Sequence, residues 1–152
     1  MVIEEGIGKA TLNPYQKDGK ILLSKVSSTG NLKKDIFQSV NMIGGFHKVI
    51  EKGDEILLKP GYNTGDPPPA SSDPDFLKAV VELLFEHGAG RVVVGESSMA
   101  MTSTRKVMGR AGALAKLQDA GAEVAFFDEG KWVKVSVGGK YVKTVSLAER
   151  AL

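Results

Sequence analysis

Three consecutive β-branched residues, Val92 to Val94, constrain the fold of this 152-residue chain more than any other feature. Neighbouring residues of a strand point to opposite faces, so an apolar run without alternation predicts a strand covered on both faces, as in a parallel sheet. Further short apolar runs at 21–26, 55–59 and 123–127 also have strand character, and the segments between them are helical in pattern. We therefore expect an α/β fold with a mostly parallel sheet flanked by helices, in a Rossmann-like three-layer arrangement.

Helix signals separate the four expected strands. Asn31 can cap a helix in which apolar residues recur every three or four positions. Asp73 and Pro74 form a strong start for an apolar helix that ends near residue 87. A third helical stretch, over 102–120, contains two glycines that should divide it into two short pieces.

The two ends of the chain differ from this alternating pattern. Residues 1–20 are polar and aperiodic and should form an N-terminal arm or an edge strand, which leaves 21–152 as a single α/β domain. Near the C-terminus, two strand-like runs flank Gly138-Gly139 and predict an appended β-hairpin over 132–145 with a two-residue turn. A short helix should begin near Ser146.

Composition excludes several classes of site. The chain has no cysteine, so it can hold no disulfide and no iron–sulfur cluster by itself, and its two histidines are too few for a three-histidine metal centre. Twenty basic and eighteen acidic residues give a net charge of +2, which does not favour a nucleic-acid partner. No apolar stretch approaches the ~18 residues of a membrane span, and acidic residues follow Met1 where a signal peptide would be basic. We therefore expect a cytoplasmic protein without a metal or a membrane segment.

Polar residues follow the expected strands, and ligands of open parallel sheets collect at the carboxyl ends of strands. Lys59, Glu96 and Asp128 should project from one edge of the sheet. Lys59 could hold a ligand anion and Glu96 could act as a general base, so these two residues are the catalytic candidates. The alternative is that all three residues are structural. Lys59 would then reach solvent or a neighbouring carboxylate, Glu96 would accept hydrogen bonds from backbone N–H groups, and Asp128 would make a turn. Other residues expected in the same cleft are Asn63, Ser97 and Ser98.

The two helix starts at this edge differ in charge. The helix after Asp73 carries a further acid, Asp75, in its first turn, whereas the helix after Met101 begins with three hydroxyl residues followed by Arg105. Free N–H groups at a helix start attract anions, so an anion should bind at the second start, near Ser97, Ser98, Thr104 and Arg105. Alternatively, the hydroxyl groups only cap the helix.

The order of several motifs resembles the domain-of-unknown-function 362 family. The resemblance extends from Ile21 to Arg150 and depends most on two blocks, Leu58-Lys59-Pro60 and Val94-Gly95-Glu96-Ser97. The other matching segments are Gly53 to Leu57, Asn63, Asp73-Pro74, Glu86 to Ala89, Arg91 to Val93, Thr104 to Met108, Gly112 and Trp132 to Val135. Here Gly61 follows the Lys-Pro pair, where family members commonly have asparagine.

The resemblance implies an uncharacterised α/β protein of a family in which many members carry an added ferredoxin-like iron–sulfur domain. Because this chain has no cysteine, an iron–sulfur cluster would have to come from a partner protein. The family domain normally continues through at least one more strand, so we expect a shortened or incomplete domain. A missing strand would leave an open sheet edge, which predicts a homo-oligomer, most simply a dimer, with the N-terminal arm covering the gap as the alternative.

Three functions are consistent with the sequence. The first is a domain that binds a small anionic ligand at the carboxyl ends of its strands. The second is an enzyme, a lyase, isomerase or redox-associated protein, that uses Lys59 and Glu96. The third is a structural or assembly domain completed by a partner chain.

Overall fold

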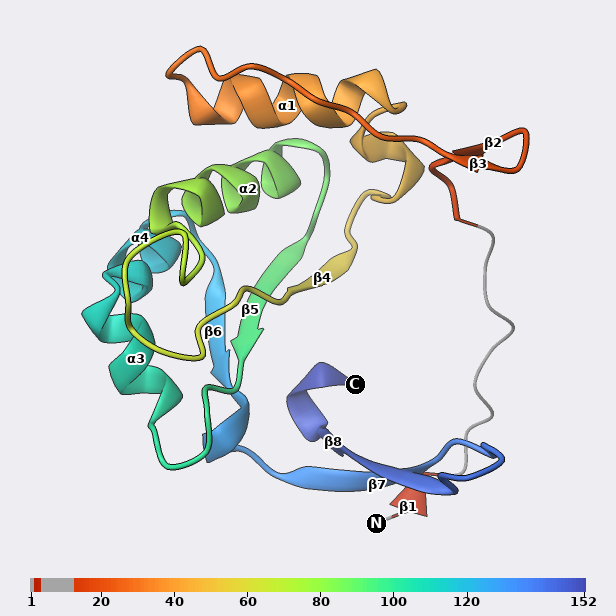
Figure 1. Ribbon diagram of the computed structural model, residues 1–152, viewed down its shortest axis with the longest axis vertical. Coiled ribbons are helices and arrows are strands. Elements are labelled where there is room, and N and C mark those ends of the chain that lie inside the picture. The colour runs from red at the N-terminus through yellow and green to blue at the C-terminus, as the bar shows by residue number, and fades with distance from the viewer. Residues whose placement is uncertain (1, 4–12) are drawn as a thin grey trace.

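A three-stranded parallel sheet forms the centre of the protein, for which a computed structural model describes residues 2–3 and 13–152 (Figure 1). The strands β4 (Glu55–Leu58), β5 (Arg91–Glu96) and β6 (Glu123–Phe126) lie in the order β4-β5-β6. β5 is the middle strand, and Val92 and Val94 are fully buried. The predicted parallel neighbours at 55–59, 91–95 and 123–127 are therefore confirmed.

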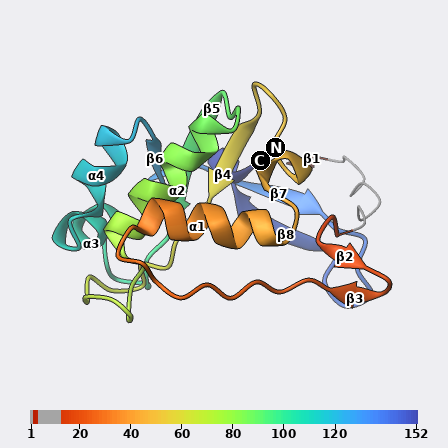
Figure 2. The ribbon, with the colours of Figure 1, turned by 90° about the horizontal axis from the view of Figure 1, so that it is seen from above.

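Four α-helices lie on one face of this sheet: α1 (Leu32–Met42), α2 (Pro74–Glu86), α3 (Thr104–Arg110) and α4 (Ala113–Asp119) (Figures 1 and 2). α2 packs on β5, α4 packs on β6, and α1 packs on the outside of α2. Both connections between strands step in the same direction across the sheet, and right-handed crossovers then place their helices on the same face. The expected three-layer arrangement is not seen in the described part of the chain.

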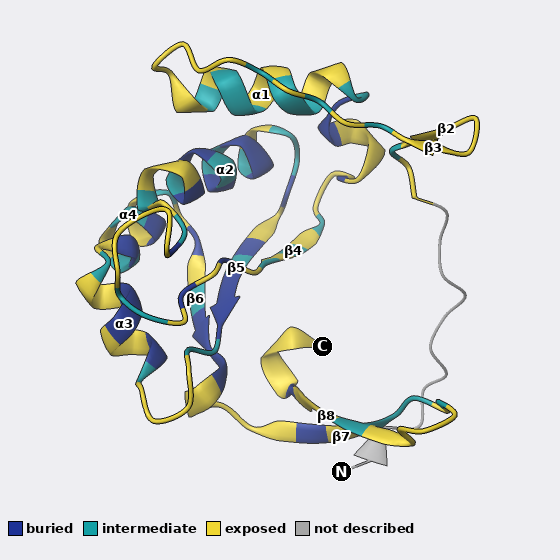
Figure 3. Cartoon of the chain, viewed as in Figure 1, coloured by how far each residue is buried: buried dark blue, intermediate teal, exposed yellow. Residues whose placement is uncertain are grey.

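The second face of the sheet has a different cover. Val93 and Ala125 point to that face and pack with Phe127 and Ala148 in a small apolar cluster. Phe127 belongs to a single 3₁₀ turn, η2 (Phe127–Glu129), that directly follows β6. A cavity of about 440 Å³ also lies there, between the sheet and the C-terminal residues Glu149 to Leu152. Figure 3 shows that most buried residues lie where the helices meet the sheet.

The residues predicted to cap or divide the helices do so in the structure. The Asn31 side chain accepts a hydrogen bond from the backbone N–H of Lys34 at 3.0 Å and caps α1. Asp73 accepts from the N–H groups of the second and third residues of α2, at 2.7 and 3.2 Å. Gly112 separates α3 from α4 because it adopts a left-handed conformation, with φ of 73°.

The strand predicted at 21–26 is wrong. β2 (Gln16–Lys17) and β3 (Lys20–Ile21) form a separate antiparallel pair, and the chain after Ile21 runs beside α1 without joining the central sheet (Figure 2). Leu23 is 93% exposed, and Ser24 Oγ lies 2.7 Å from Ser39 Oγ of α1. An extended segment that packs on a helix needs apolar residues on one side only, so its sequence resembles that of a strand. The predicted 1–20 arm lies partly outside the described residues.

The C-terminal hairpin exists, but its register differs from the prediction. β7 (Trp132–Ser136) pairs antiparallel with β8 (Thr144–Ala148), and β1 (Val2–Ile3) pairs parallel with β7. A longer loop replaces the predicted two-residue turn, and the N–H of Val137 closes it by donating to the Lys143 carbonyl at 3.0 Å. Lys134 therefore lies opposite Ser146, and not opposite another lysine as the shorter turn would require.

The helix predicted from Ser146 is also wrong, because Ser146 belongs to β8 and only a 3₁₀ turn, η3 (Glu149–Ala151), follows. The backbone N–H of Glu149 donates to the Lys131 carbonyl at 2.9 Å and so continues the strand pairing to the end of the hairpin. Within the residues that the structure describes, no helix has the length and apolar content needed to cross a bilayer.

A pair of glycine substitutions tests the packing where α2 leads into β5. A Cβ atom at Gly90 would lie 2.7 Å from the carbonyl oxygen of Gly53, a backbone atom that cannot rotate away. Gly90→Ala should therefore lower the free energy of unfolding by about 1–3 kcal/mol. Gly109→Ala is the matched control: it lies in α3 with only a Leu114 methyl group at 3.8 Å, so it should raise stability by about 0.5–1 kcal/mol. Urea denaturation measures both, and equal effects would contradict this packing.

Candidate functional site

A buried carboxylate lies where β4 and β5 end. Glu96 is the last residue of β5 and is 1% exposed. One carboxylate oxygen, Oε1, accepts from Lys59 Nζ at 2.6 Å and from the Ser97 backbone N–H at 2.7 Å, and the other, Oε2, accepts from the Tyr62 N–H at 3.1 Å. The charge of Glu96 is thus neutralised and its oxygens are hydrogen-bonded, as a buried carboxylate requires.

The partner of this carboxylate, Lys59, lies nearer to solvent. Its side chain is 57% exposed, and Nζ also donates to the Pro60 carbonyl at 3.2 Å. The two catalytic candidates are therefore in contact, at the strand edge where the sequence places them. In this contact the lysine supplies the positive charge that Glu96 needs.

Tyr62 fixes the loop that follows Lys59. Its ring is fully buried, and its hydroxyl group donates to the Ser72 carbonyl at 2.7 Å. Burial, and secondly the negative charge of Asp73, raises the pKa of Tyr62 to about 12, so the hydroxyl group stays protonated at neutral pH. This anchoring holds the Tyr62 N–H against Glu96.

A chain of hydrogen bonds continues from this loop to β6. Ser98 Oγ donates to the Tyr62 carbonyl at 2.6 Å, and the Ser98 N–H donates to Thr104 Oγ1 at 2.8 Å. The Thr104 N–H in turn donates to Asp128 Oδ2 at 3.1 Å. Partial burial opposes ionisation of Asp128, but the hydrogen bonds from the Thr104 side chain and backbone outweigh it and lower its pKa. We call this connected set, from Lys59 to Asp128, the strand-end network.

The strand-end network occupies the helix start at which the sequence predicts an anion. The Asp128 carboxylate receives the Thr104 N–H, and Ser103 Oγ receives the Lys106 N–H at 3.4 Å. Two N–H groups of the first turn of α3 are thus already bonded within the protein, which matches the alternative that hydroxyl groups cap the helix. Asn63 is exposed, and its backbone carbonyl accepts a hydrogen bond from the Met99 N–H at 3.4 Å, outside the strand-end network.

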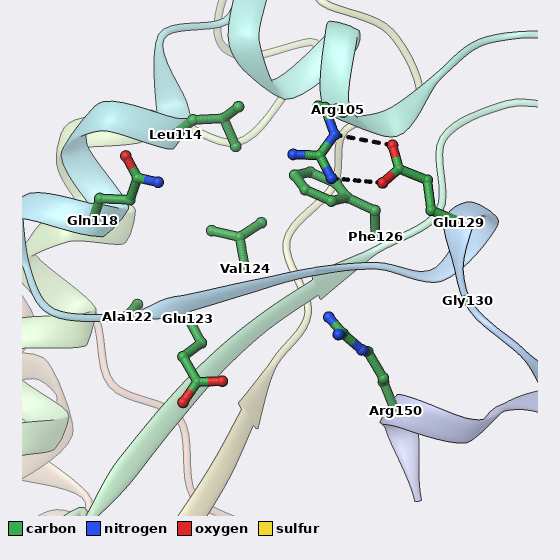
Figure 4. A pocket seen from close by; sticks show the side chains of 10 residues that line it. All are labelled: Arg105, Leu114, Gln118, Ala122, Glu123, Val124, Phe126, Glu129, Gly130 and Arg150. Atoms are coloured by element: carbon green, nitrogen blue, oxygen red, sulfur yellow. Dashed lines mark hydrogen bonds and ion pairs between the residues drawn. The ribbon is translucent and has the colours of Figure 1, made fainter.

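The Arg105 side chain points away from the strand-end network. Its Nε and Nη2 atoms donate to the two carboxylate oxygens of Glu129 at 3.0 and 2.6 Å. Its guanidinium carbon lies 4.2 Å from the centre of the Phe126 ring, which places the positive charge over the ring face. The third nitrogen, Nη1, points into a cavity beside β6 (Figure 4).

This cavity has a volume of about 470 Å³ and lies along the outer edge of β6; we call it the β6-edge pocket. Val124 and Leu114 provide apolar surface, and the Gln118 amide lies beside them at one end (Figure 4). Arg150 extends toward the pocket from η3 on the opposite side. The other lining residues are Ala122, Glu123, Phe126, Glu129 and Gly130.

Sequence reasoning missed most residues of the β6-edge pocket. Gln118 and Arg150 are far apart in the sequence and carry no motif. For Phe126, the sequence predicts a place in a strand but no role in a pocket. The one available signal was that Arg105 and Glu129 have opposite charges and follow elements that end at the same edge. For a metal, the described residues offer no group of three or more histidine, aspartate or glutamate side chains close enough to share an ion.

Comparison with known proteins gives a family and one relative. Residues 56–152 match the family described as Domain of unknown function (DUF362). A thylakoid-associated protein of Synechocystis is 30% identical over 118 residues, which are 76% of this chain and 36% of the relative. The chain thus spans little more than a third of the length of that relative. No solved structure matches the chain.

The family match begins in β4 and includes the whole strand-end network and the β6-edge pocket. It also contains the Leu58-Lys59-Pro60 and Val94 to Ser97 blocks from which the sequence suggested a resemblance. This chain belongs to the DUF362 family.

Proposed function

We propose that the chain binds a small organic anion in the β6-edge pocket, with Arg105 and Arg150 as the groups that hold it. The observation that carries the proposal is the charge balance of the pocket. Glu129 is paired with Arg105, and Glu123 is paired with Arg91 outside the pocket. Arg150, in contrast, forms no ion pair within 4 Å among the described residues, although its charge contributes to the lowered pKa of Glu123. A ligand anion would supply the missing negative charge.

The two acidic residues of the pocket, Glu123 and Glu129, already form ion pairs. Bidentate hydrogen bonding from Arg91 lowers the pKa of Glu123, and hydrogen bonding from Arg105 lowers the pKa of Glu129. Both carboxylates are therefore ionised at neutral pH. Glu129 is balanced by Arg105, whereas Glu123 shares Arg91 with Glu55 and is also influenced by the charge of Arg150. Their repulsion of an incoming anion is reduced accordingly.

The size and lining of the pocket favour a particular ligand class. A volume of about 470 Å³ suits a small molecule, and sites for such ligands combine an apolar lining with a few polar groups. Val124 and Leu114 would contact an apolar body, while the free Nη1 of Arg105 and the Arg150 guanidinium would bind the anionic group. Arginine favours carboxylate and phosphate because its planar fork matches their oxygens. We therefore infer a carboxylate or phosphate attached to a small apolar body.

The Lys59–Glu96 pair supports catalysis less well. A general base must reach the proton that it removes, but Glu96 is buried and its oxygens already accept three hydrogen bonds. Lys59 is held by the same carboxylate, so a ligand anion would have to compete with Glu96 for it. Structural neutralisation explains both residues without a substrate.

Anion binding can be tested by titrating ¹⁵N-labelled protein with phenyl phosphate or benzoate and following the amide resonances. The Gln118 side-chain amide and the backbone amides around Val124 should shift. Arg150→Gln should weaken binding about tenfold or more, because a charge-assisted hydrogen-bonding partner is lost. Arg110→Gln is the matched control: it makes the same change of charge at an exposed arginine outside the pocket and should leave affinity within about twofold.

Two results would overturn the proposal. One is a set of resonance shifts centred on Lys59 and Ser97, which would show that the ligand binds at the strand-end network and not in the pocket. The other is an equal loss of affinity in Arg150→Gln and Arg110→Gln, which would mean that only overall charge attracts the probe.

A second prediction separates stability from binding at Glu96. Glutamine has one acceptor oxygen, so in Glu96→Gln the amide NH₂ group must face either the Tyr62 or the Ser97 N–H. Unfolding by urea should show a loss of about 1–3 kcal/mol. Lys59→Met should cost at least as much, because it leaves the buried Glu96 carboxylate without its compensating positive charge. Both variants should still bind phenyl phosphate at temperatures where they are folded, and loss of binding in folded Glu96→Gln would favour the strand-end site.

A further inference from the structure

The loop between β7 and β8 exposes apolar side chains at the end of a hairpin. Tyr141 is 86% exposed and Val142 is 54% exposed, and they lie between two exposed lysines, Lys140 and Lys143. We call residues 138–143 the hairpin tip. Lys140 Nζ lies 5.4 Å from the centre of the Tyr141 ring, so charge and aromatic surface are presented together.

The hairpin that carries this tip is uniformly basic. From Lys131 to Ala148 the sequence holds four lysines and no acidic residue. Lys131 and Lys134 belong to the same hairpin and are exposed, as are the two lysines of the tip. In a chain with a net charge of only +2, this is a local concentration of positive charge.

We propose that the hairpin tip docks on the surface of an anionic lipid bilayer. Tyrosine is enriched at membrane interfaces, where its ring lies at headgroup depth, and lysines beside it pair with anionic headgroups. Val142 would enter the outermost acyl region next to Tyr141, while the lysine stems extend along the interface. Such a contact needs no membrane-spanning helix, so it is compatible with the lack of one among the described residues.

A bilayer fits the hairpin tip better than other partners do. A stable protein interface buries about 800 Å² on each partner, more than six loop residues present. Nucleic-acid binding depends on many phosphate contacts and would leave the exposed Val142 without an apolar partner. A fluid surface requires no shape complementarity from the protein and accepts charge and apolar surface from a small loop.

The position of the tip allows this contact. In Figure 1 the loop lies at the end of the hairpin remote from β6 and from the helices. The β6-edge pocket is lined by residues of α3, α4, β6 and η3 and by no residue of the hairpin tip. The hairpin tip and the pocket share no residue, so each proposal is tested by its own variants and either can fail without the other.

Co-sedimentation of the full chain with lipid vesicles tests the proposal. The protein should sediment with vesicles that contain 30 mol% phosphatidylglycerol in phosphatidylcholine, and not with phosphatidylcholine alone, at low salt. Each lysine near an anionic surface contributes about fivefold in affinity, so Lys140→Gln/Lys143→Gln should weaken binding about 25-fold. Tyr141→Ser/Val142→Ser should weaken it about tenfold through lost apolar contact.

Lys17→Gln/Lys20→Gln is the matched control, because it removes the same charge from two exposed lysines of the β2–β3 hairpin. It should retain binding within about twofold. Three outcomes would overturn the proposal: equal loss in this control, equal binding to uncharged vesicles, or no binding at millimolar lipid. Binding of a single-stranded oligonucleotide that depends on the same tip residues more strongly than lipid does would identify nucleic acid as the partner instead.

Discussion

The burial of one carboxylate, Glu96, determines how the carboxyl edge of the sheet is built. An ionised carboxylate removed from water is tolerated only when it is paired and hydrogen-bonded. Lys59 and the N–H groups of Tyr62 and Ser97 meet that requirement together, and they come from the ends of two neighbouring strands. The loop after β4 must therefore return over the end of β5. Its carbonyl at Tyr62 is then placed to accept from Ser98, which joins α3 and β6 to the same set of hydrogen bonds.

In this arrangement, the polar groups at the carboxyl ends of the strands, where parallel sheets usually bind ligands, are bonded to one another. The charges of Lys59 and Glu96 cancel, and Asp128 fills the start of α3. The anion site that we propose lies instead at the outer edge of β6, where Arg105 lies over Phe126 and keeps one nitrogen free of the Glu129 pair. The proposal therefore depends on charges that lack a full internal partner and not on the polar residues at the strand ends.

The elements with local causes could be predicted from the sequence. Asn31 and Asp73 act on N–H groups two or three residues away, so both predicted caps are correct. The Val92 to Val94 run correctly predicts the middle strand, but Val93, on the second face, is only partly buried. The errors concern partners that are distant in sequence. Residues 21–26 have the pattern of a strand but pack on α1, and the glycines at 138–139 look like a tight turn but belong to a longer loop. Likewise, the Lys59–Glu96 contact follows from strand order, whereas the pocket around Arg105 depends on side-chain directions that no pattern encodes.

The hairpin and the pocket share a mechanical link through β8. Ala148, the last residue of β8, is buried against Ala125 and Phe127 on the second face of the central sheet. Arg150 follows two residues later, in η3, and reaches the β6-edge pocket from there. The free positive charge of the pocket is therefore positioned by the hairpin and not by the helical layer that supplies Arg105 and Gln118. A shift of β8 along the sheet would move Arg150 relative to Arg105 and change the distance between the two guanidinium groups that a ligand anion has to bridge.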